Sequence, residues 1–238
     1  MAHCRDFSSA PYPGEYPPYD YAVIRGEVVP VQLTDSGLAD RIGLDIAASL
    51  ATHIPLLTYG SNACPGRMVE KFGDDAERLH GILVFRAMAS NLARAWCARP
   101  ASSGVLPYTI VGAADETEVH VVLLPRHLIS IMDESEGRGA SLYVVGRLTE
   151  CEVRLPDGQT WQRPLTYIGT GKFGPLVIDG KLQRPETISR EDLDPDLARG
   201  RNDDCLLPPY ELIPPTLPLT EVVDFTGADA ALAALLQR

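Results

Sequence analysis

The fold of this chain is decided by the stretch Ile54-Pro55-Leu56-Leu57-Thr58-Tyr59-Gly60-Ser61-Asn62. Its apolar first half predicts a strand, and its glycine-bearing second half predicts a tight turn. A helix is expected directly afterwards, over residues 64–72, with Asn62 as its cap. A strand–turn–helix junction points free backbone N–H groups into a space where a carboxylate or developing oxyanion can bind. Taken alone, the same residues also fit an ordinary turn. A functional role for them requires a partner group elsewhere in the chain that could carry out the chemistry.

That partner lies in a second segment, Met132-Asp133-Glu134-Ser135-Glu136-Gly137, which is followed by Tyr143. Together the two segments resemble the gamma-glutamylcyclotransferase family. In that family a YGSN-type loop binds the substrate's alpha-carboxylate, and a glutamate at a helix end acts as acid and base. The resemblance implies that Glu136 is catalytic. It implies that the substrate-binding residues are Tyr59, Gly60, Ser61, Asn62 and Tyr143, although Tyr143 could equally fill the wall of the fold.

The resemblance covers about residues 54–180 and implies an α+β fold, a small mixed β-barrel with flanking helices. Residues 107–110, 115–118 and 119–124 look like a strand, an acidic turn and the next strand of that family. Residues 82–97 are ambiguous, because the second half has helical propensity whereas the family would place strands there. We favour strands. A further helix is expected over residues 125–133, just before Glu136, and a hairpin around residues 156–158.

Three regions are expected along the chain. Residues 1–50 form an N-terminal extension, with a loosely packed Pro/Tyr-rich arm over 8–20, then a strand or hairpin and a helix over 38–50. Residues 51–182 form the catalytic core. Residues 183–238 form an acidic, proline-rich extension with irregular structure and a last helix over 228–237, which could dock on the core or on a second subunit of a homodimer.

Composition excludes several classes of protein. With 32 acidic against 21 basic residues, the net charge is −11, and no basic run is present that could follow a phosphate backbone, so nucleic acid is not expected as a partner. The five cysteines are scattered and lack CxxC spacing, which favours a reducing compartment. Because no signal peptide or long apolar segment is evident, we expect a cytoplasmic protein without membrane contact.

Other chemistries have weaker support in the sequence. Ser61 lacks the second glycine of a nucleophile elbow, and the five histidines show neither HxH nor HExxH spacing, so neither a serine hydrolase nor a metal site is predicted. Cys64 at a helix start is a conceivable thiol nucleophile, but a packing role is favoured. Glu134 competes with Glu136 for the catalytic role, and Glu136 itself could simply be a solvated acid.

The sequence therefore predicts a cofactor-independent gamma-glutamyl cyclotransferase. The substrate would be a small gamma-glutamyl-type amide whose own alpha-amine attacks the gamma-carbonyl, releasing 5-oxoproline or a related lactam and an amine or amino acid. The alternative is a member of the same fold that binds a small molecule, or acts as a scaffold, without turnover. Glu136 within reach of the loop amides inside one closed cavity would favour the enzyme, whereas an N- or C-terminal extension that plugs the cavity would favour the binding protein.

Overall fold

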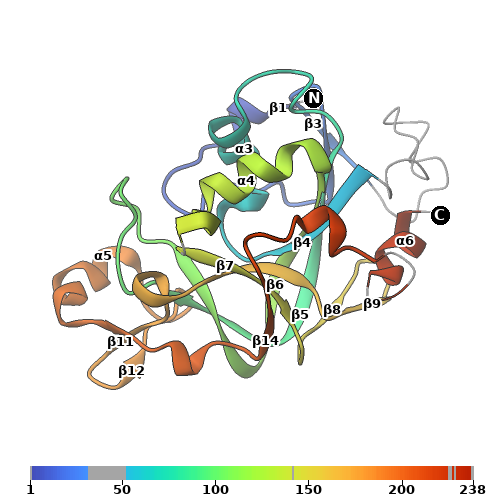
Figure 1. Cartoon of the computed structure of the whole chain (residues 1–238). Coiled ribbons are helices and arrows are strands. Elements are labelled where there is room, and N and C mark those ends of the chain that lie inside the picture. The colour runs from blue at the N-terminus through green and yellow to red at the C-terminus, as the bar shows by residue number, and fades with distance from the viewer. Residues whose placement is uncertain (1, 32–51, 141, 225–226, 228, 237–238) are drawn as a thin grey trace.

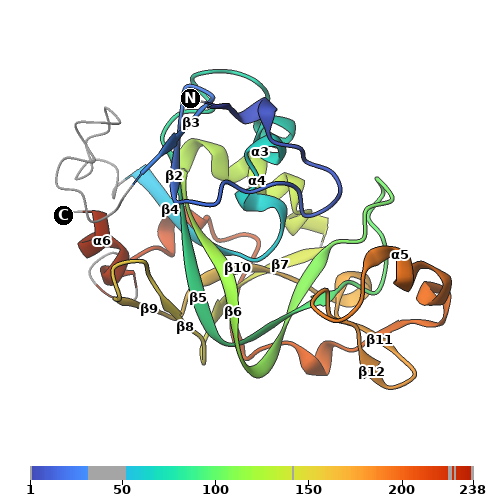
Figure 2. The same ribbon diagram turned by 180° about the vertical axis from the view of Figure 1, so that it is seen from behind.

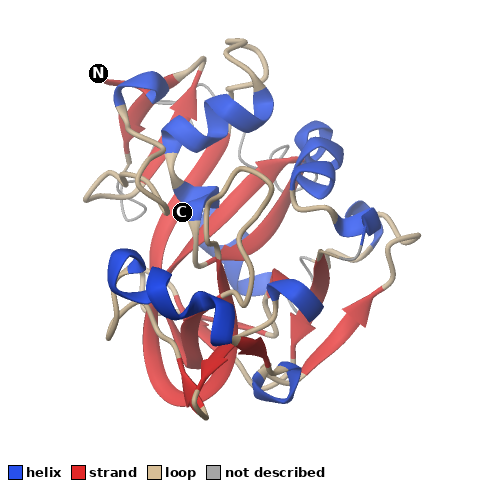
Figure 3. Cartoon of the chain, turned by 90° about the vertical axis from the view of Figure 1, so that its left-hand side faces the viewer, coloured by secondary structure: helices blue, strands red, loops and turns tan. Residues whose placement is uncertain are grey.

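The computed structural model describes residues 2–31, 52–140, 142–224, 227 and 229–236. The helix expected over residues 38–50 lies outside this range. The fold is mixed α+β, with one large curved sheet and few helices on its outside (Figures 1 and 3). Along this eleven-stranded sheet the order is β1 (Ala2–His3), β3 (Glu27–Pro30), β2 (Tyr21–Ile24), β5 (Ile82–Trp96), β6 (Tyr108–Pro125), β4 (His53–Thr58), β10 (Leu165–Gly169), β7 (Tyr143–Leu148) and β14 (Tyr210–Ile213), with β8 (Glu152–Arg154) and β9 (Thr160–Gln162) attached through β5.

The remaining elements are short. A second sheet has the order β12 (Lys181–Leu182), β11 (Leu176–Ile178) and β13 (Arg201–Asn202). Within the described residues, the α-helices are α3 (Pro65–Phe72), α4 (Ile129–Ser135), α5 (Arg190–Leu193) and α6 (Ala230–Leu236). Among the described residues, no helix is long and apolar enough to cross a membrane.

The large sheet is apolar on both faces because its central strands carry near-continuous apolar runs. Successive side chains of a strand point to opposite faces. On β6, Val122 and Leu124 therefore pack into the core beneath α3 and α4, whereas Val121 and Leu123 pack into the core on the other side. The strand β4 divides in the same way, and all six of its residues are buried. The loop after β4 thus starts from a fully buried strand.

The predicted strand, turn and helix around residues 54–72 are confirmed, but the predicted cap is wrong. A 3₁₀ turn over Ser61–Ala63 separates β4 from α3, and Cys64, not Asn62, is the N-cap of α3. Pro65 occupies the first helical turn, where its missing N–H costs nothing. Asn62 is too early to cap the helix, and its side chain instead accepts a hydrogen bond from Lys71.

The strand preferred for residues 82–97 is confirmed as β5, which pairs with β6 in one long antiparallel ladder. Helical propensity loses here because the ladder pairs the backbone and buries apolar side chains on both faces. The acidic turn predicted at residues 115–118 is wrong, since those residues continue β6. The irregularity falls instead on β5, where the ladder shifts register between Ser90 and Leu92 and Asn91 has a φ of 59°.

The predicted barrel is also wrong, because the sheet is open. Its path begins at β1 and ends at β14, and these two strands are not paired with each other. Both lie in segments that we predicted to be extensions of the core. A barrel requires its first and last strands to share hydrogen bonds, whereas here β1–β3–β2 lengthens one end and β14 the other. The division into residues 1–50, 51–182 and 183–238 stays a prediction.

Two predictions for the second half of the chain are confirmed. Leu155, Gln159 and Gly158 form the predicted tight turn, and β8 and β9 pair on either side of it. The last helix, α6, packs on the core, where Leu232 is fully buried (Figure 1). A 3₁₀ turn over Arg126–Leu128 precedes α4 in the region where a helix was predicted over residues 125–133.

Burial of one histidine predicts a pH dependence of stability. Burial, assisted by Arg86 and Arg94, lowers the pKa of His120 from 6.5 to about 4. Above pH 6.5 the imidazole is neutral in both states, but as the pH falls toward 4 only the unfolded chain gains the proton. We therefore expect the free energy of unfolding to decrease between these values. Urea denaturation across this range should show a smaller decrease in His120→Gln, and an equal decrease would contradict the assignment.

Candidate active site

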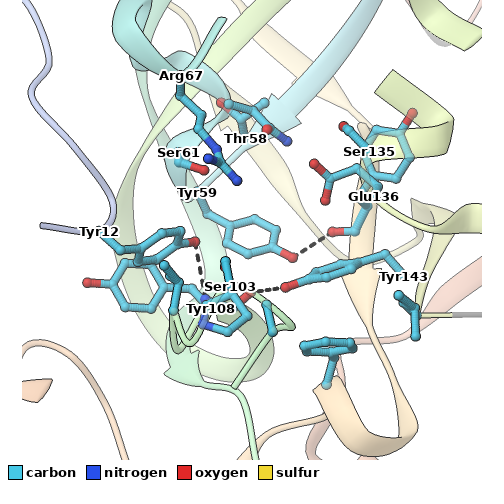
Figure 4. A pocket seen from close by; sticks show the side chains of 18 of the residues that line it. Tyr12, Thr58, Tyr59, Ser61, Arg67, Ser103, Tyr108, Ser135, Glu136 and Tyr143 are labelled. Atoms are coloured by element: carbon cyan, nitrogen blue, oxygen red, sulfur yellow. Dashed lines mark hydrogen bonds between the residues drawn. The ribbon is translucent and has the colours of Figure 1, made fainter. Parts of the chain in front are cut away.

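A cavity of about 460 Å³ opens at the C-terminal end of β4 (Figure 4). Its walls come from the loop after β4, from α3, the C-terminal end of α4, residues 100–107 before β6, the starts of β6 and β7, β10 with the turn after it, and the N-terminal arm. All six residues predicted for the site line it: Tyr59, Gly60, Ser61, Asn62, Glu136 and Tyr143. Residues far apart in the sequence thus share one cavity of small-molecule size.

The side chain of Tyr59 anchors the loop to the neighbouring strand β10. The side chain of Tyr59 is buried, and its hydroxyl donates a hydrogen bond of 2.6 Å to the carbonyl of Tyr167 on β10. Burial raises the pKa of Tyr59 well above 10, so this hydroxyl stays protonated. Gly60 follows in an extended conformation, and a Cβ added there would overlap the hydroxyl oxygen of Tyr12. A side chain at this position would displace the Tyr12 hydroxyl, so glycine allows the N-terminal arm to approach the loop closely.

Glu136 enters the cavity from the end of α4. It is the C-cap residue, and the following Gly137 has a φ of 63°, the left-handed conformation that commonly ends a helix. The side chain of Glu136 is only 12% exposed and pairs with the ammonium of Lys71, whose side chain is 8% exposed. The same ammonium donates a 2.6 Å hydrogen bond to Oδ1 of Asn62. Lys71 therefore joins the loop and the carboxylate in one network.

The neighbouring acids have other positions. Asp133 accepts a 2.6 Å hydrogen bond from the Tyr167 hydroxyl and pairs with the buried guanidinium of Arg138 at 2.9 Å. Glu134 is exposed and does not line the cavity. Of the three acids at the end of α4, Glu136 is the one that the cavity contains.

Tyr143 lies at the opposite wall. Its hydroxyl donates a 3.1 Å hydrogen bond to the carbonyl of Tyr108, and its ring stacks on Phe173 with the centroids 5.6 Å apart. Figure 4 shows its ring facing the cavity below Glu136. These contacts fit either role predicted for Tyr143, because the residue both packs the wall and borders the cavity.

Among the residues of the cavity that sequence reasoning missed, Lys71 and Tyr12 matter most for its chemistry. Lys71 was not singled out because a lysine in the last turn of a short helix is ordinarily solvated. Tyr12 was assigned to a loosely packed arm, whereas the arm packs against the loop and Tyr12 lines the cavity. Arg67 also lines the cavity and pairs with Glu70. The spacing of Asn62 and Lys71 across a helix start gave no signal, since their contact depends on how α3 packs.

The geometry gives little support to a cysteine nucleophile, a serine hydrolase or a metal site. Burial raises the pKa of the Cys64 thiol, and its sulfur lies 3.5 Å from the carbonyl of Ser8 and outside the cavity lining. Ser61 lines the cavity, but none of the described residues that line it is a histidine. Among the described residues, no group of three or more His, Cys, Asp or Glu side chains is placed to hold a metal ion. The groups available are thus the Glu136 carboxylate, the cationic side chains of Lys71, Lys172 and Arg67, hydroxyls, and backbone amides.

Comparisons with known proteins give fold similarity alone. No family model matches the chain, and no curated protein sequence matches it. Among solved structures, it is similar to a gamma-glutamyl cyclotransferase at 14% identity and a TM-score of 0.41, over 64% of this chain and 90% of that one. It is also similar to an uncharacterized protein from Homo sapiens, at 15% identity and a TM-score of 0.41, over 64% of this chain and 90% of that one. For YkqA from Bacillus subtilis the identity is 14% and the TM-score is 0.39, over 68% of this chain and 62% of that one. At these identities the function has to be argued from the cavity.

Proposed function

We propose that the protein is a cofactor-independent gamma-glutamyl cyclotransferase that releases 5-oxoproline, or a related lactam, from a small gamma-glutamyl amide. The observation that carries the proposal is the Lys71 bridge. One ammonium contacts both Asn62 of the loop and the carboxylate of Glu136. The anion-binding loop and the candidate acid–base group therefore lie within reach of one small substrate.

The reaction requires little machinery beyond correct folding of the substrate. The alpha-amine forms a C–N bond to the gamma-carbonyl carbon, and the C–N bond to the leaving amine then breaks. Backbone N–H groups of Gly60, Ser61 and Asn62 would bind the alpha-carboxylate. Fixing a near-attack geometry in this way can contribute about 7–11 kcal/mol.

One carboxylate can perform both proton transfers. Glu136 would take one proton from the substrate ammonium to free the attacking amine and give it to the leaving nitrogen; it would then pass on the second proton that the attacking nitrogen loses on forming the lactam, so that the amine departs as an ammonium. Lys71 would position the Glu136 carboxylate and release it toward the substrate as the substrate carboxylate approaches the same ammonium. We name Lys71 a positioning residue because it acts through Glu136 and Asn62.

The test of this function is direct. The wild-type protein is incubated with gamma-glutamyl amides that carry amino-acid and amine leaving groups, and 5-oxoproline is measured by mass spectrometry. Product formation that disappears in Glu136→Gln supports the proposal. Absence of product from every member of both classes would contradict it.

The second candidate is a protein of the same fold that binds a small anion without turnover. The observation that favours it is the ion pair between Glu136 and Lys71. Before Glu136 can accept a proton as a base, its carboxylate must separate from the Lys71 ammonium. Binding of a gamma-glutamyl amide with no product from the wild type would support this alternative.

The Lys71 bridge predicts a kinetic effect. In Lys71→Met we expect kcat/KM to fall about 10- to 100-fold, because a hydrogen bond involving a charged group contributes about 1.5–3 kcal/mol. Lys71→Arg, which keeps the charge, should recover part of the loss. Steady-state kinetics and a melting temperature are measured for each. If Lys71→Met lowers only the melting temperature and leaves both kinetic constants unchanged, then Lys71 is purely structural.

A further inference from the structure

The N-terminal arm belongs to the frame of the cavity. The hydroxyl of Tyr16 donates a 3.1 Å hydrogen bond to the carbonyl of Gly60. At the start of α3, a Cβ added to Gly66 would overlap the carbonyl oxygen of Phe7. The arm runs beside α3 in Figure 2, in blue. Segments on both sides of Tyr12 are thus attached to the loop and its helix.

Tyr12 lies where the arm reaches the cavity (Figure 4). Its hydroxyl oxygen accepts a 3.2 Å hydrogen bond from the backbone N–H of Tyr108, and the two rings meet edge to face with centroids 4.8 Å apart. The same oxygen occupies the space that a side chain at Gly60 would fill. The hydroxyl is therefore held beside the glycine of the anion-binding loop.

The hydroxyl hydrogen of Tyr12 is available. A phenol can donate one hydrogen bond and accept others. Within the part of the chain that the structure describes, the oxygen accepts from Tyr108 but the O–H donates to no protein acceptor. Burial raises the pKa of Tyr12 well above 10, so the donor persists at neutral pH. A partly buried donor without a protein acceptor, placed on the cavity wall next to an anion-binding loop, fits an oxygen of the ligand.

We propose that Tyr12 is a substrate-binding residue whose hydroxyl donates a hydrogen bond to the substrate carboxylate at Gly60. The inference rests on the proposed function and deepens it. It assigns one donor of the carboxylate site to the N-terminal arm, outside the segment in which the sequence resembles the cyclotransferase family. The backbone amides of the loop would supply the remaining donors. The arm then contributes to substrate affinity and does not merely cover the core.

The test compares Tyr12→Phe with Tyr19→Phe, which removes a hydroxyl from the same arm outside the cavity lining. With a gamma-glutamyl amide as substrate, we expect the KM of Tyr12→Phe to rise about 10- to 100-fold, as for loss of a hydrogen bond to a charged group. Its kcat should change little, because the carboxylate is bound equally in ground and transition states. Tyr19→Phe should match the wild type. Unchanged KM in Tyr12→Phe, or equal effects in both variants, would overturn the proposal.

A binding measurement separates this proposal from the proposed activity. Calorimetric titration of Glu136→Gln with gamma-glutamylalanine reports affinity without turnover, and the double variant Glu136→Gln/Tyr12→Phe should bind about 10- to 100-fold more weakly. Weaker binding by the double variant supports the role of Tyr12 even if the wild type forms no product. Equal affinity overturns that role even if the wild type is active. If Glu136→Gln does not bind the probe at all, the Tyr12 proposal also fails.

Discussion

Glu136→Gln should lose nearly all cyclotransferase activity while keeping its fold. Glutamine preserves the size of the side chain but cannot exchange a proton with the substrate amine. General acid–base catalysis contributes typically about 10²–10⁴-fold, so we expect kcat to fall by that range. Mass-spectrometric detection of 5-oxoproline under saturating substrate measures it, with circular dichroism as the check on the fold.

The matched control is Glu134→Gln. It makes the same change two residues away on an exposed side chain outside the cavity. We expect wild-type kinetics, since surface substitutions away from special features are usually nearly neutral. Equal loss in both variants would mean that the charge of the helix end, and not the proton of Glu136, is responsible. Full activity in Glu136→Gln would remove this residue from the mechanism.

Asp229→Ala should have the largest effect on stability. Asp229 is fully buried and accepts hydrogen bonds from both Nη atoms of Arg147, at 3.3 and 3.2 Å, and from Nε1 of Trp161, at 2.9 Å. It also accepts a 3.0 Å bond from the backbone of Asp224. Alanine would leave the buried guanidinium of Arg147 without its counter-charge. Breaking a buried ion pair costs about 3–5 kcal/mol, so the midpoint of urea denaturation should fall sharply.

An exposed pair provides the comparison. Arg154 and Glu116 lie 3.3 Å apart, and both side chains are more than half exposed. Glu116→Ala should therefore cost less than about 1 kcal/mol, because solvent screens exposed pairs. If Asp229→Ala costs no more than Glu116→Ala, the buried network does not anchor α6 to the sheet.

The local structure around the cavity was predictable from sequence. The apolar run before Tyr59 predicts a buried strand that pairs in a sheet. Gly60 and Pro65 mark where the turn and the helix follow. The placement of Glu136 at a helix end also followed, because Gly137 readily adopts the left-handed conformation that stops a helix. Strand pairing over residues 82–97 needed the family resemblance as well, since propensity alone pointed partly to a helix.

Contacts between distant segments were not predictable. The spacing of Asn62, Lys71 and Glu136 carries no sign that one ammonium joins them, because that contact depends on the packing of α3 against α4. Tyr12 offers the same lesson, since a proline-rich arm has no periodicity to reveal a buried face.

By itself, the sequence determined the elements that depend on neighbouring residues: the strand, turn and helix that carry residues 59–62, and the helix end that carries Glu136. Only the tertiary structure decided that the sheet stays open, that the arm walls the cavity and that Lys71 bridges its two halves. The physical reason is range. Backbone conformation is fixed by a few adjacent side chains, whereas strand order and buried ion pairs are selected by the packing of the whole chain.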